Sequence, residues 1–76
     1  MFKIDWKEFL ESNDSAKGIG IVMRIIKFTN DGKTCILKDL SSNRDACMDI
    51  PHIVAEVRKG YLYLTNPSVL KRKIGC

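Results

Sequence analysis

Residues 19–28 read IGIVMRIIKF, and together with the segments that follow they decide the fold. This stretch is long and rich in β-branched residues, which favours a strand. Residues 30–32, Asn-Asp-Gly, are a strong hairpin signal because the turn needs residues that tolerate positive φ. Further strands are predicted at 33–40 and, after a turn at 41–43, at 46–50. Three strands joined by tight turns predict an antiparallel meander.

Alternation along the first strand predicts which side chains face the core. The odd positions from 19 to 25 are all apolar, so we expect them to be buried. The even positions, which include Arg24 and Phe28, are mixed and should face a more open surface. Gly20 marks a bend of the kind that a small barrel needs.

The remaining segments predict two helices and two more strands. Pro51 ends the third strand, and residues 52–58 predict a short helix that ends at Gly60. Strands are predicted at 61–65 and 69–74, with a turn between them. Residues 1–14 predict a short N-terminal amphipathic helix, because Phe2, Trp6 and Phe9 recur at helical spacing. This aromatic face packs either on the body of the domain or on a partner, which includes a second copy of the chain.

The order of these elements predicts a small barrel. Residues 1–76 are short enough for a single OB-like domain, with the barrel over residues 18–76. Three strands, a short helix and two strands follow the order of a five-stranded OB-fold barrel, an all-β architecture with short helices. The alternative is an Sm-like or SH3-like small barrel, which places its helix before the first strand.

The net charge of +4 is concentrated near the C-terminus. Residues 57–76 hold five basic residues and no acidic residue. Such an end attracts polyanions, chiefly nucleic acid, although a solubilising tail has the same composition. No apolar run approaches the roughly 18 residues that span a membrane. No signal-peptide core opens the chain, so we expect an intracellular protein, nuclear if the organism is eukaryotic.

The sequence predicts neither a catalytic site nor a metal site. Cys35, Cys47 and Cys76 have no paired spacing, and His52 is the only histidine. A structural zinc site needs four ligands in close pairs, so we expect free thiols in a reducing compartment. No nucleophile or carboxylate is grouped with His52 in the pattern that catalysis requires. We therefore expect no catalytic residue, no metal and no cofactor, and we do not expect an enzyme.

Three segments carry a resemblance to a known family. Residues 36–42 form an apolar strand that ends in Asp39 and a small-residue turn, and residues 48–53 lead into the helix through His52. Residues 58–64 begin with two basic residues and Gly60, which lead directly into the predicted fourth strand. Together they resemble OB-fold domains of the replication protein A and homologous recombination OB-fold kind. The resemblance implies single-stranded DNA binding, or docking in a complex for DNA replication, recombination or repair.

Single-strand binders combine a basic groove with exposed aromatic side chains. Tyr61 and Tyr63 alternate with leucines, so we expect both to share one face of the fourth strand. That face is either the ligand face or the core. Phe28 either stacks on a base or plugs one end of the barrel. The candidate nucleic-acid-binding residues, with single-stranded DNA expected ahead of RNA, are Arg24, Lys27, Phe28, Lys33, Lys38, Tyr61, Tyr63, Lys71, Arg72 and Lys73.

Overall fold

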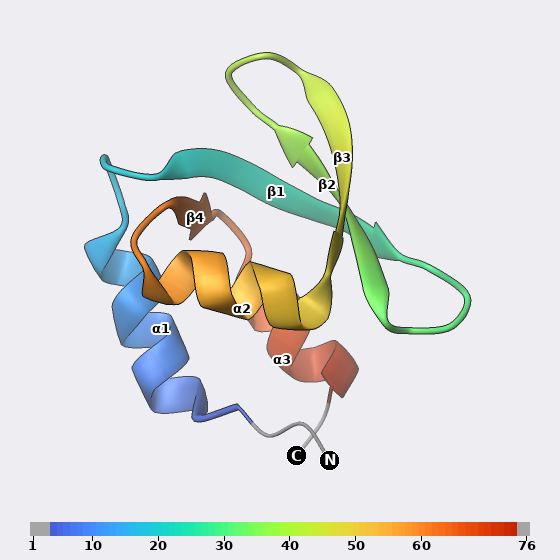
Figure 1. Ribbon diagram of the computed structural model, residues 1–76, viewed down its shortest axis with the longest axis horizontal. Coiled ribbons are helices and arrows are strands. Elements are labelled where there is room, and N and C mark those ends of the chain that lie inside the picture. The colour runs from blue at the N-terminus through green and yellow to red at the C-terminus, as the bar shows by residue number, and fades with distance from the viewer. Residues whose placement is uncertain (1–3, 75–76) are drawn as a thin grey trace.

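The computed structural model describes residues 4–74, which form three helices packed on one face of a four-stranded sheet (Figure 1). In chain order the elements are α1 (Trp6–Ser15), β1 (Ile21–Phe28), β2 (Thr34–Asp39), β3 (Arg44–Asp49), α2 (Ile50–Arg58), β4 (Leu62–Leu64) and α3 (Ser68–Ile74). The predicted meander is confirmed, because β1, β2 and β3 pair antiparallel in that order. The fourth strand lies on the other side of β1 and runs parallel to it.

The predicted all-β fold is wrong, and so are both barrel alternatives. The sheet has four strands in the order β3-β2-β1-β4 and stays open, so neither a five-stranded OB-fold barrel nor an Sm-like or SH3-like barrel forms among the described residues. Residues 69–74, expected as the closing strand, lie in α3. A strand would have placed Leu70 and Arg72 on the same face, whereas the helix buries Leu70 and exposes Arg72. Leucine, lysine and arginine are also favourable helix formers.

A side chain of α1 occupies the Leu64 end of the edge at which a fifth strand would pair with β4. The buried Asn13 donates its Nδ2 to the carbonyl of Leu64 at 3.0 Å, and its Oδ1 accepts the Leu64 N–H at 2.8 Å. This amide therefore satisfies both backbone groups that Leu64 turns away from β1. Asn66 makes the same pair of bonds with Ile25, each 2.9 Å long, where β1 continues past the end of β4.

The two predicted helices are present, and their apolar faces are used within the domain. Gly60 has φ +82° directly after the last residues of α2, as its position past the helix predicts. Phe9 of α1 is fully buried, and Trp6 packs against it edge to face with the ring centroids 5.7 Å apart. The aromatic face of α1 is thus occupied by the domain's own core. Phe2, the third member of this face, lies outside the described residues.

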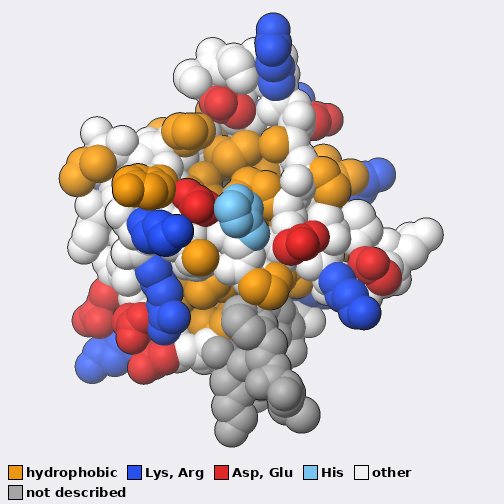
Figure 2. Space-filling view, viewed as in Figure 1, with side chains coloured by type: hydrophobic (Ala, Val, Ile, Leu, Met, Phe, Trp, Pro, Cys, Tyr) orange, Lys and Arg blue, Asp and Glu red, His pale blue; other side chains and the backbone are white. Residues whose placement is uncertain are grey.

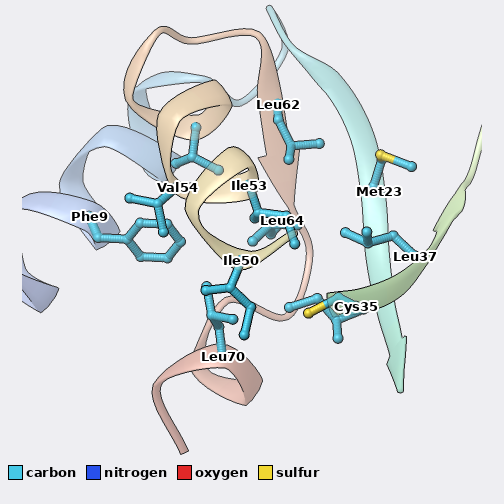
Figure 3. Close-up of a cluster of buried hydrophobic side chains, with 12 residues drawn as sticks. Phe9, Met23, Cys35, Leu37, Ile50, Ile53, Val54, Leu62, Leu64 and Leu70 are labelled. Carbon is cyan, nitrogen blue, oxygen red and sulfur yellow. The ribbon is translucent and has the colours of Figure 1, made fainter. Parts of the chain in front are cut away.

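The core lies between the helices and one face of the sheet (Figure 3). Met23 and Ile25 are buried there, as the alternation in β1 predicts. Ile19 and Ile21 were expected to join them but are 80% and 58% exposed. Ile19 lies in the turn before β1 and outside the sheet. The helices do not cover the end of the sheet that starts with Ile21, and Figure 1 shows the β2–β3 hairpin extending past α2.

Candidate nucleic-acid interface

The outer face of the sheet carries the first group of predicted binding residues. The buried residues of β1 and β2 alternate with residues that point to the opposite face, which none of the three helices covers. Arg24 and Lys38 occupy this face, and the registers of β1 with β2 and of β1 with β4 bring Val22 and Tyr63 beside them.

Arg24 and Lys38 are direct cross-strand partners. Like charges placed opposite each other on an antiparallel pair reduce stability. Lys38 is partly neutralised from its other side, since its Nζ lies 3.6 Å from Oδ1 of Asp45. Arg24 forms no ion pair with any residue in the described range 4–74. The centre of the face therefore has positive charge that a bound anion would compensate.

A β-bulge adds Lys27 to this face and removes Phe28 from it. The register shifts by one between Ile25 and Lys27, so Ile26 is the extra residue and Lys27 lies opposite Ile36. After the bulge Phe28 pairs with Cys35 and packs against the core. The expectation that Phe28 faces the open surface is wrong, because the extra residue reverses the alternation.

The leucines of β4 settle how Tyr63 is oriented. Leu62 and Leu64 are buried, so the half-buried Tyr63 between them points to the outer face, opposite Val22. Leu40, which follows β2 and donates its N–H to the carbonyl of Val22, is 47% exposed. Leu40, Val22 and Tyr63 thus form an apolar row next to the cationic pair.

Tyr61 belongs to a different surface. It precedes β4 and is 63% exposed. It lines a groove of about 150 Å³ on the helical side of the sheet, together with Ile21, Met48 and His52. The two tyrosines therefore lie apart, because only Tyr63 falls within the three residues of β4.

The remaining predicted residues gather at the β1–β2 turn and on α3. The Nζ of Lys73 lies 5.5 Å from the ring centroid of Phe28, so the end of α3 meets the hairpin that carries Lys33. Lys71 and Arg72 are exposed on the helical layer. Asp31 offsets the charge of the turn, since hydrogen bonds from the Thr29 hydroxyl and then from the Lys33 N–H lower the pKa of its carboxyl. The structure therefore divides the predicted site into a compact face and a separate basic end.

Sequence reasoning missed the apolar members of the outer face. The alternation predicts a more open surface for Val22. Charge and aromatic character alone, however, do not select Val22, Ile36 or Leu40 as binding residues. The signal was present in the alternation, since Ile36 and Leu40 share the phase of Lys38 along the second strand.

Comparison of the chain with known proteins gave no matching family model, no similar curated protein and no similar solved structure. Within residues 4–74, no cluster of three or more histidine, cysteine or acidic side chains is arranged to hold a metal ion. The described helices are all too short or too polar to cross a membrane. The function is therefore argued from the geometry of the outer face.

Proposed function

We propose that the protein binds single-stranded nucleic acid across the outer face of its sheet, with DNA as the first ligand to test. The observation that carries the proposal is the like-charged pair of Arg24 and Lys38 beside an apolar row that ends in Tyr63. Such a pair has a cost in the free protein that phosphate binding would remove. Single-strand binders combine these same two elements, cations that follow the backbone and an aromatic surface for a base.

Each residue of the outer face has a role in the proposed binding that follows from its side chain. Arg24, Lys38 and Lys27 contact phosphates, and their positive charge draws the strand to this face. A base stacks on Tyr63, which contributes on the order of 1–3 kcal/mol for a single stacked base. Ile36 and Leu40 supply apolar contact on either side of the cations. A role in DNA replication, recombination or repair rests only on the resemblance carried by residues 36–42, 48–53 and 58–64. The barrel fold no longer supports this role, because the sheet is open.

Fluorescence anisotropy with a labelled oligothymidine tests the proposal. We expect saturable binding at low salt that weakens as salt is added, because phosphate contacts release counterions. Tyr63→Ala should weaken binding by about tenfold or more, as expected for loss of one stacked base. An oligouridine of the same length, titrated in parallel, measures the preference for DNA over RNA.

Matched variants separate this face from the rest of the molecule. Tyr61→Ala removes an exposed tyrosine from the groove on the helical side, and Lys71→Ala removes one charge from α3, so both should retain most of the affinity. Absence of binding at high micromolar protein would overturn the proposal. Equal losses in Tyr61→Ala and Tyr63→Ala would also refute it, since the outer face would then not be the binding surface.

A further inference from the structure

The two edges of the sheet differ, because within the described residues a side chain bonds outward backbone groups on the β4 edge and none does so on the β3 edge. On the β4 edge the amide of Asn13 bonds the N–H and the carbonyl of Leu64. On the β3 edge the ladder alternates, and the Ile50 N–H donates to the carbonyl of Lys33 at 3.0 Å just beyond its end. Arg44, Ala46 and Met48 therefore bond to β2.

It follows that Asp45 and Cys47 turn both their N–H and C=O groups outward, and that Asp49 turns its N–H outward. No backbone hydrogen bond within the described part of the chain uses these groups. The Asp49 carbonyl faces the first turn of α2, because Asp49 is the N-cap of that helix. The strand has no proline, and all three side chains are exposed on the outer face. Such an edge is a template for another extended chain.

The two faces of β3 have different chemistry. Asp45 and Asp49 lie on the outer face, where the Asp45 side chain is 61% exposed and Asp49 accepts the Thr34 hydroxyl at 3.2 Å. Ala46 and Met48 lie on the helical face, and Met48 lines the groove that contains Tyr61. Figure 2 shows hydrophobic side chains gathered on this side of the molecule, between β1, the β2–β3 hairpin and α2.

We infer that β3 accepts an extended peptide as a fifth strand, and that the peptide is basic at two positions four residues apart. Those two residues lie opposite Asp45 and Asp49, where opposite-charge cross-strand pairs are favourable. The peptide residues opposite Ala46 and Met48 are apolar, because they extend the apolar surface of the helical side. The occupant is thus an extended segment of another protein with a basic–apolar–any–apolar–basic pattern. This inference does not depend on the nucleic-acid proposal.

A second copy of the chain fits this edge less well. Antiparallel pairing about a two-fold axis allows two registers of five residues. One sets Asp45 opposite Asp49, and the other sets Asp45 opposite Cys47. Neither places a cation opposite an aspartate, so charge complementarity favours a basic peptide over self-association.

An NMR titration of the labelled full chain tests the inference with two synthetic peptides, SGKVTVKGS and its charge-reversed control SGEVTVEGS. The basic peptide should shift the amide signals of Asp45, Cys47 and Asp49 and slow their exchange with solvent. The acidic peptide should bind about tenfold more weakly, because two favourable cross-strand pairs become repulsive. No saturable shift at millimolar peptide, or shifts centred on Arg24, would overturn the inference.

Two variants sharpen the test. The double variant Asp45→Lys and Asp49→Lys should reverse the preference, so that the acidic peptide binds more tightly. Cys47→Pro removes an outward N–H without removing a bond to β2, and should abolish binding while the remaining signals keep their positions. If the charge-reversed variant folds but keeps its preference for the basic peptide, the proposed register is wrong.

Discussion

The two faces of the sheet are built from adjacent residues of the same strands and have opposite properties. On the helical face Cys35 and Leu37 are fully buried, whereas Ile36 between them remains partly exposed on the outer face. Isoleucine is more hydrophobic than cysteine, so the difference comes from the covering layer and not from the residue type. A position on these strands is therefore buried or left open to solvent according to whether a helix covers it.

The largest expected effect follows from truncating neighbouring residues on the two faces. Leu37→Ala should lower the free energy of unfolding by about 2–5 kcal/mol, because it leaves a cavity between the sheet and the helices. Ile36→Ala removes similar volume from the open face and should cost less than about 1.5 kcal/mol. Urea denaturation of both variants measures the difference. Equal losses would mean that a further layer covers the outer face.

The pH dependence of stability should differ between the buried Cys35 and the exposed Cys47. Burial raises the pKa of the Cys35 thiol from its ordinary 9.0 to about 11, and the nearby Cys47 adds a smaller contribution in the same direction. The folded state therefore holds the Cys35 proton more tightly than the unfolded state. Its contribution to stability is complete below pH 9 and declines as the pH rises toward about 11.

At about pH 10 this effect should cost on the order of 1 kcal/mol relative to neutral pH. Denaturation of the wild type and of Cys35→Ala at both pH values isolates it, since the other titrating groups are common to both proteins. Cys47→Ala, on the exposed edge strand, should keep most of the wild-type dependence. If Cys35→Ala retains the full alkaline loss, the thiol is not responsible for it.

Local sequence patterns predicted the structure well where neighbouring residues determine the conformation, as in turns, at helix ends and in the alternation of a strand. Neighbours in the sequence determine the hairpin at residues 30–32 and the helix that ends before Gly60. They also determine which residues of β1 are buried, as Met23 and Ile25 are. The failures depend on residues far apart. The amide of Asn13 bonds Leu64 on the β4 edge, 51 residues away in the sequence, and no local pattern distinguishes such an asparagine from one in a turn.

The candidate site was predicted in the same uneven way. Arg24, Lys27 and Lys38 were chosen by charge, and the sheet brings them together because they share its uncovered face. Phe28 was misplaced by a single bulged residue, which a period-two pattern cannot register. The helical layer contains Lys71, Arg72 and Lys73, because this segment forms α3 and not the predicted fifth strand.

The smallest expected effect is the most informative about the outer face. Arg24→Thr should raise the free energy of unfolding by about 0.5 kcal/mol, because it removes the like charge opposite Lys38 and threonine suits a strand. The same variant should weaken oligonucleotide binding if the proposed function is correct, because it removes the phosphate contact proposed for Arg24. Lys27→Thr is the matched control, since Lys27 lies opposite Ile36 and its removal should weaken binding without this gain in stability.

Opposite signs for stability and affinity in Arg24→Thr would identify a position kept for binding at the expense of stability. A substitution that lowers stability and leaves affinity unchanged would instead mean that the aliphatic part of Arg24 covers its apolar neighbours on the outer face. The charges of Arg24 and Lys38 would then be ordinary solvated surface charges, and the two faces of the sheet would differ in packing alone.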